Sequence, residues 1–176
     1  MLRNTTAQRR TGTARNITDP NEKAKLARQI ELIKKIREWE RFNKLAGYDP
    51  YPYQQRFHAT GSNCSQRLLM AGNRIGKSFS GACETAMHLT GLYPEWWSGR
   101  RYTQPINAWV GGVSSETTRD ILQAELLGTP GDPAALGTGA LPRDSILTTQ
   151  RKPGVPNAIS TAQIKHTSGG TSYLFI

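Results

Sequence analysis

Cysteine, acidic side chains and long apolar runs are all scarce in this sequence of 176 residues. No run approaches the roughly 18 uninterrupted apolar residues of a membrane-spanning helix, and the N-terminus lacks the apolar core of a signal peptide. The two cysteines, Cys64 and Cys83, do not have the CxxC spacing of a zinc or redox pair. We therefore expect a cytoplasmic protein without membrane association, whose thiols stay reduced.

The shortage of acidic residues leaves a formal net charge of +10, and this charge is unevenly distributed. Residues 1–47 carry 12 Lys/Arg and 5 Asp/Glu, a net charge of +7, which leaves +3 for the remainder. A basic arm on a nearly balanced body favours a polyanionic partner such as nucleic acid. A tail that serves only solubility is the alternative.

The N-terminal region divides into two predicted parts. Residues 1–18 are polar and basic with almost no large apolar side chains, so we predict that they are disordered. Asp19 and Pro20 have the pattern of an N-cap and a first-turn proline, and a basic amphipathic helix is expected over residues 19–47, ending at Gly47. Its apolar side chains recur at three- and four-residue steps: Leu26, Ile30, Ile33, Ile36 and Trp39.

Residues 48–176 are predicted to form a partial α/β domain with a mostly parallel sheet. Short apolar runs bounded by polar residues are typical of buried parallel strands, and helices are expected to follow them. Alternation of this kind predicts a right-handed βαβ unit. The predicted elements are a strand at 67–71, a helix at 78–90 that ends at Gly91, a strand at 108–113, and a helix from Ser114 or Ser115 to about Leu127.

The remaining third of the chain has weaker signals. Residues 129–158 are rich in glycine, proline and threonine and are predicted to be loop. Residues 163–176 are predicted to form a hairpin with its turn at Gly169 and Gly170. Because the chain stops at Ile176 within an apolar run, we expect a sequence that has been cut short.

Residues 71–78, "AGNRIGKS", fit the phosphate-loop pattern G-x-x-x-x-G-K-[ST], with alanine at the first position. Gly76 would let successive N–H groups face phosphate oxygens, and Lys77 would bridge the β- and γ-phosphates of ATP. The Ser78 hydroxyl would bind Mg²⁺, and Arg74 could reach the γ-phosphate. A glycine turn with exposed cations, or a DNA contact by Arg74, is the alternative. The candidate nucleotide-binding residues of this loop are Ala71, Gly72, Asn73, Arg74, Ile75, Gly76, Lys77 and Ser78.

ATP hydrolysis requires a further element, an apolar strand that ends in Asp or Glu for the magnesium ion. Seven acidic residues follow the loop, and none comes directly after an apolar run. We therefore expect nucleotide binding by this chain, and activity as an ATP hydrolase only in an intact parent protein.

Three smaller groups have competing interpretations. Glu84 falls on the helix after the loop and is expected at the surface. The three histidines are scattered and receive neither a metal nor a base role; they are His58, His88 and His166. A tryptophan and arginine cluster could face DNA or another subunit, although core packing of the tryptophans is favoured; its members are Trp96, Trp97, Arg100 and Arg101.

Four segments together resemble the N-terminal ATPase region of the large terminase subunits of tailed bacteriophages: "YPYQQRFH", "MAGNRIGKS", "ETAMHLTGLYPEWWSGRR" and "PINAWVGGVSSETTRDILQAELLG". The resemblance covers about residues 48–176 and is loose before them. It implies a P-loop NTPase fold and, for Gln54 in "YQQRF", recognition of adenine by the side-chain amide, with Gln55 as the neighbouring candidate. Two surface glutamines in a turn are the alternative.

The resemblance also implies partners and a cellular setting. Large terminase subunits use ATP and Mg²⁺ to move double-stranded DNA into a capsid. The implied partners are the capsid portal protein, the small terminase subunit and further copies of the same chain in a ring. The implied location is the cytoplasm of the host cell. A non-catalytic nucleic-acid-binding module or a truncated relict is the alternative function.

Overall fold

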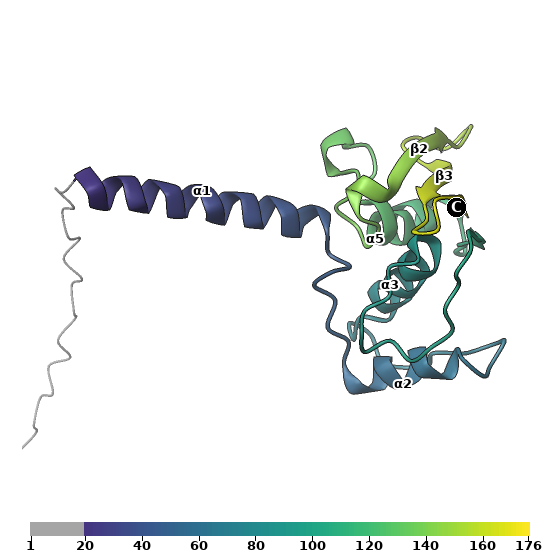
Figure 1. The fold of residues 1–176 in the computed structure, drawn as a ribbon. Coiled ribbons are helices and arrows are strands. Elements are labelled where there is room, and N and C mark those ends of the chain that lie inside the picture. Colours follow the sequence, from purple (N-terminus) through teal and green to yellow (C-terminus); the bar gives the residue numbers. More distant parts are fainter. Residues whose placement is uncertain (1–19) are drawn as a thin grey trace, which may run out of the picture. The chain divides into compact units, whose positions relative to one another are not determined.

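The computed structural model describes residues 20–176 (Figure 1). The predicted disorder of residues 1–18 and the predicted cap at Asp19 lie outside the described residues. The chain divides into two units, residues 1–37 and residues 38–176, which are described separately. Within residues 20–176, none of the helices combines the length and the apolar composition that a bilayer span requires.

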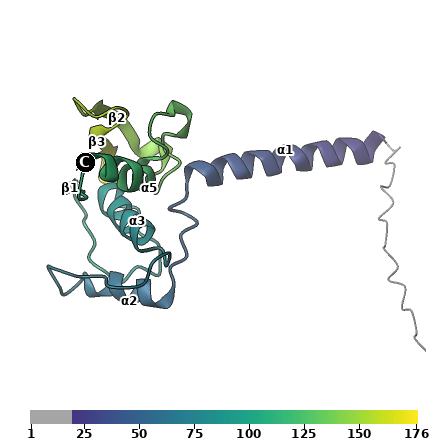
Figure 2. The same ribbon diagram turned by 180° about the vertical axis from the view of Figure 1, so that it is seen from behind.

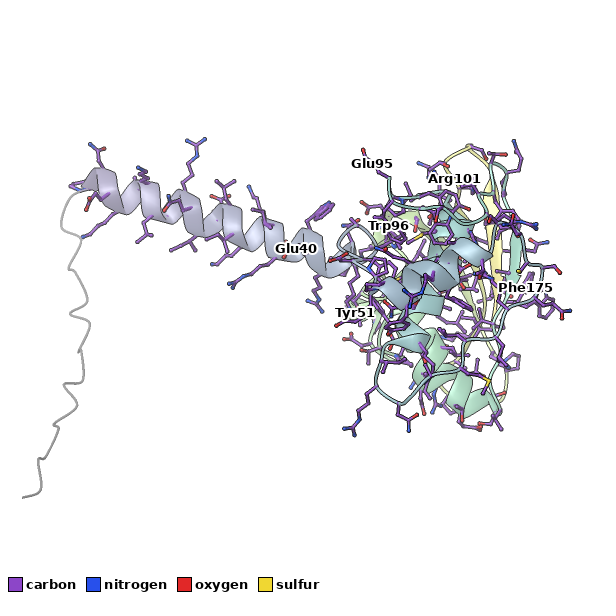
Figure 3. All side chains as sticks on the ribbon, turned by 90° about the horizontal axis from the view of Figure 1, so that it is seen from below. Glu40, Tyr51, Glu95, Trp96, Arg101 and Phe175 are labelled. Atoms are coloured by element: carbon purple, nitrogen blue, oxygen red, sulfur yellow. The ribbon has the colours of Figure 1, made fainter. Side chains whose placement is uncertain are left out.

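Helix α1 spans Pro20–Phe42 and begins at the proline that the sequence indicates. None of its side chains is buried, and they project from all sides of the helix (Figure 3). The helix ends at Phe42, five residues before the predicted end at Gly47. The reason is tertiary: the chain turns after Phe42, and this turn allows Leu45 and Tyr48 to enter the core of the body.

The sheet of the body has four strands in the order β1-β4-β3-β2 among the described residues. Strand β1 (Asn107–Trp109) runs parallel to β4 (Thr171–Phe175). Strand β3 (Ile159–Lys165) is antiparallel both to β4 and to β2 (Ile146–Arg151). The predicted hairpin with its turn at Gly169 is confirmed, and Figure 2 shows β1 beside the C-terminus.

The prediction of a mostly parallel sheet was wrong for two reasons. Residues 67–71 form no strand, because no described strand lies beside them, and Leu68 and Met70 are about 80% exposed. Residues 146–151 were predicted to be loop but form β2, because β3 offers them a continuous set of main-chain partners. Pairing with a neighbour, more than local composition, decided which segment became a strand.

Helices pack on the sheet and build the core. Helix α3 (Lys77–Thr90) confirms the helix predicted after the loop, and Gly91 ends it in the left-handed conformation. The helix predicted near residues 115–127 is present as α4 (Ser115–Thr117), a π-helical turn η1 (Thr118–Gln123) and α5 (Ala124–Leu127), with Ser114 as its cap. The remaining helical elements are α2 (Pro52–Thr60) and the 3₁₀ turns η2 (Pro133–Ala135) and η3 (Arg143–Ser145).

The core lies between α3, α5 and the sheet. Its fully buried side chains include Met87 and Leu89 of α3 and Ile164 and Leu174 of the sheet. Trp97 belongs to this core, and Trp96 packs against it, as the structural interpretation of the tryptophans predicted.

The two free thiols lie in contrasting environments, which gives a test of the fold. Cys64 is exposed, whereas Cys83 is completely buried in α3. Burial raises the pKa of the Cys83 thiol to about 12. We expect one rapid equivalent of reaction with a thiol reagent at pH 8 in the native protein, two equivalents in denaturant, and no rapid reaction in Cys64→Ser. Rapid labelling of both cysteines in the native protein would contradict this packing.

Candidate phosphate-binding site

Loop 71–78 connects segment 67–70, in which Leu68 and Met70 are exposed, to the first turn of α3. Two of its residues have left-handed backbone, Arg74 with φ 62° and Gly76 with φ 78°. Gly76 is the N-cap of α3, and no side chain caps this helix among the described residues. The first N–H groups of α3 are therefore available to an anion, at the end of the helix where the macrodipole is positive.

The Lys77 ammonium group is held over the loop by the main chain of the loop itself. Its Nζ donates to the carbonyl oxygens of Ala71, at 2.8 Å, and Gly72, at 2.5 Å. The positive charge and the uncapped N–H groups consequently lie at the same loop. Ser78 is exposed in the first turn of α3.

Helix α2 contacts the loop through two of its side chains. The Tyr53 hydroxyl donates to the carbonyl of Ile75, and Gln54 Nε2 lies 3.4 Å from the carbonyl oxygens of both Ile75 and Gly76. Gln54 Oε1 accepts from the N–H of Tyr51 at 2.9 Å. Gln54 is 3% exposed, so it is no surface glutamine, whereas Gln55 is exposed.

Two pockets adjoin the loop. One, of about 590 Å³, is lined by Tyr48, Tyr51, Gln54, Gly76 and Phe79 among others. Its volume is in the range of small-molecule sites. The second, of about 320 Å³, has Ser78, Thr85, Trp109 and Glu125 on its wall. No group of three or more acidic, histidine or cysteine side chains that could hold a metal ion occurs among residues 20–176.

Glu84 is buried, which contradicts its predicted surface position. Its carboxylate accepts from His58 Nδ1 at 2.8 Å and from both terminal nitrogens of Arg67, and His88 Nε2 lies 3.4 Å away. Burial alone would raise the pKa of Glu84, but the hydrogen bonds from His58, His88 and Arg67 outweigh it and hold this pKa far below its usual range. One signal was available in the sequence: Ser80, Glu84 and His88 recur every four residues and so share one side of α3.

The buried network continues from His58 toward the start of α3. Because a carboxylate only accepts, His58 Nδ1 carries a hydrogen. His58 Nε2 lies 3.1 Å from Ser80 Oγ and 3.0 Å from the Tyr48 hydroxyl, which donates to Ser80 Oγ. Burial raises the pKa of Tyr48 to about 12, so its hydroxyl stays protonated at neutral pH.

The comparisons with known proteins identify the family. The sequence family "Terminase large subunit, T4likevirus-type, N-terminal" matches residues 68–175, more than half of the chain. The chain is also 34% identical, over 153 residues, to the large terminase subunit of Salmonella phage P22. The chain belongs to the large terminase subunits of phages.

The extent of these matches is uneven. The alignment with the P22 terminase subunit covers 78% of this chain and 31% of the relative, so the chain spans about a third of that protein's length. The terminase family match includes the whole of loop 71–78, and it begins after Gln54. No solved structure was found to match.

The two glycines of the loop differ in conformation and provide matched variants. Gly76→Ala is expected to lower the free energy of unfolding by about 1 kcal/mol, because the left-handed backbone disfavours a side chain. The added Cβ would also lie 3.2 Å from Gln54 Nε2. At Gly72 an added Cβ meets no atom within 4 Å, and Gly72→Ala should change stability by less than about 0.5 kcal/mol. Urea unfolding measures both, and equal effects would contradict the loop conformation.

Glu84→Gln is expected to lower the free energy of unfolding at pH 7 by about 3 kcal/mol, because Arg67 loses its buried partner. The folded-state pKa of Glu84 is lowered, so its contribution to stability is complete above the ordinary glutamate pKa of about 4.3 and is lost as the pH falls below that value. The difference between wild type and Glu84→Gln should therefore shrink below about pH 4.3 in denaturant titrations. Glu95→Gln, at an exposed glutamate labelled in Figure 3, is the control and should match wild type throughout. A difference that grows with acid would contradict the ionised pair.

Proposed function

We propose that this chain is the ATP-binding part of a phage DNA-packaging motor, in which loop 71–78 binds the β- and γ-phosphates of ATP. One observation carries the proposal: an uncapped helix start, a left-handed Gly76 and the Lys77 ammonium group come together in one loop. These are the features of a phosphate-loop NTPase. Membership in the terminase family supports the same reading.

Each loop residue has a proposed role. The N–H groups at the start of α3 donate to phosphate oxygens, and Lys77 exchanges its two carbonyl partners for phosphate oxygens, which are stronger acceptors. The Ser78 hydroxyl is a ligand for Mg²⁺, which neutralises phosphate charge when it is bound. Arg74 is exposed and has a left-handed backbone, which is unusual for a residue with a side chain. Its guanidinium group is proposed to reach the γ-phosphate.

The pocket beside Gln54 is proposed to receive the adenine base. Tyr51 and Phe79 supply aromatic walls next to Gly76, so a base there would be adjacent to the phosphates. Gln54 Oε1 has a second lone pair after its bond to Tyr51, and the contacts of Nε2 at 3.4 Å are long. The amide can therefore offer one acceptor and one donor to the base.

The intact protein is proposed to couple ATP hydrolysis to the movement of double-stranded DNA into a capsid. This step rests on the family, because the chain spans about a third of its relative. The proposed setting is the host cytoplasm, with a ring of subunits on the capsid portal protein and a small terminase subunit as partner.

A second candidate is a nucleic-acid-binding module that acts through α1. Seven Lys/Arg and four Glu occur in this helix, and none of its side chains is buried (Figure 3). Such binding would weaken steeply with salt. It would not require Lys77.

Replacement of Lys77 tests the first function. Lys77→Ala is expected to weaken binding of a fluorescent ATP analogue with Mg²⁺ by about 100-fold, because two charge-assisted hydrogen bonds to phosphate are lost. The fold should be unchanged, since the hydrogen bonds of the Lys77 ammonium group in the described structure are to loop carbonyls. The exposed Lys165 provides the control, and Lys165→Ala should bind like wild type. Unchanged affinity in a folded Lys77→Ala variant would refute the phosphate loop, and salt-sensitive DNA binding without nucleotide binding would favour the second candidate.

A further inference from the structure

The Glu84 carboxylate lies where three segments of the body meet. Glu84 itself is on α3, His58 is on α2, and Arg67 is in the segment that leads into loop 71–78. Glu84 is 6% exposed and His58 1% exposed, so both are shielded from solvent, whereas Arg67 is partly exposed. Interactions between charges are stronger and less screened in such a place than at the surface.

One arm of this junction fixes the segment before the loop. The Arg67 guanidinium group donates to both oxygens of Glu84, and its NH1 also donates to the carbonyl of Phe57 at 3.0 Å. It lies over the Phe57 ring at 4.7 Å from the centroid. Residues 68–70 form no strand, and Leu68 and Met70 are exposed. Arg67 is the last residue before the loop whose side chain makes hydrogen bonds in the described structure.

The other arm fixes the helix after the loop. His58 bridges from Glu84 to Ser80, whose N–H donates to the carbonyl of Gly76 at 2.9 Å. Helix α2 also holds the loop directly, through Tyr53 and Gln54. Both ends of loop 71–78 are thereby connected to one carboxylate.

Ser80, His58 and Glu84 have the order of a nucleophile, a base and an acid in a hydrolase. Ser80 is completely buried, and no substrate could reach its hydroxyl. The arrangement is therefore structural, and its effect must be exerted through the loop that it supports.

We propose that Glu84 is a positioning residue for loop 71–78: together with Arg67 and His58 it sets the separation of the two loop ends and so preorganises the loop for a triphosphate. The proposal rests on the proposed function for its ligand, but its effect on the loop exists without nucleotide. A fixed loop avoids the entropy cost of ordering on binding. Glu84 acts only through other residues and does not contact the ligand.

Nitrogen-relaxation order parameters of the backbone N–H groups of residues 72–78 in the nucleotide-free chain are the decisive measurement, followed by titration with the fluorescent ATP analogue. Glu84→Gln is expected to lower these order parameters from about 0.85 to below about 0.6 and to weaken nucleotide binding by about tenfold. The control is Met87→Ala, one turn further along α3, which removes a fully buried apolar side chain outside the network. Met87→Ala should lower the melting temperature to a similar extent while leaving the loop order parameters and the affinity unchanged. Arg67→Lys retains the charge, and the expected result is a smaller change in the same direction, so it gives the answer if Glu84→Gln fails to fold.

The outcomes separate this proposal from the proposed function. Order parameters of residues 72–78 that are unchanged in Glu84→Gln, or equally lowered in Met87→Ala, overturn the positioning role whether or not wild type binds ATP. Lower order parameters limited to the network variants support the positioning role. If wild type then bound no nucleotide, the proposed ATP-binding function would be refuted and the positioning role would stand.

Discussion

Different parts of helix α3 lie in three environments: the apolar core, a buried polar network and the open loop at its first turn. The packing of the body depends on this helix. One side of the helix carries Met87 and Leu89 into the apolar core. Another side carries Ser80, Glu84 and His88 into a buried polar network. The first turn stays open to the loop, to which Gly76 and Lys77 belong. Because the buried sides prevent the helix from shifting, the free N–H groups of its first turn keep a defined direction.

The buried carboxylate of Glu84 is costly by itself, since a charge leaves water. Arg67 and His58 offset this cost; both precede the loop in the sequence, whereas Glu84 follows it. The network therefore links α2, α3 and the segment before the loop through side-chain hydrogen bonds. Loss of one partner would leave a charge without compensation, which makes such pairs sensitive to substitution. The positively charged loop leads into the same helix that carries the buried anion.

Membership in the terminase family connects the loop with phage DNA packaging, which the geometry of the loop alone does not indicate. The sheet nevertheless differs from the arrangement that the motif suggests. A single parallel pair, β1 with β4, lies beside a three-stranded antiparallel arrangement. The segment that enters the loop has no strand neighbour in the described chain, and Leu68, Met70 and Trp109 stay about 80% exposed. The loop is thus held by helix α2 and by side chains, without a ladder of main-chain hydrogen bonds.

The sequence alone was sufficient to predict helix α3 and its end at Gly91, the cap at Ser114 and the hairpin turn at Gly169. Each of these features depends on residues within a few positions of one another. The end of α1 at Phe42, the strand at 146–151 and the direction of most of the sheet were decided by tertiary contacts. The burial of Glu84 belongs with these. Its partners His58 and Arg67 are 26 and 17 residues away in the chain, and no local pattern joins them. A side chain's neighbours across such distances are set only when the core closes, so spacing alone could not reveal them.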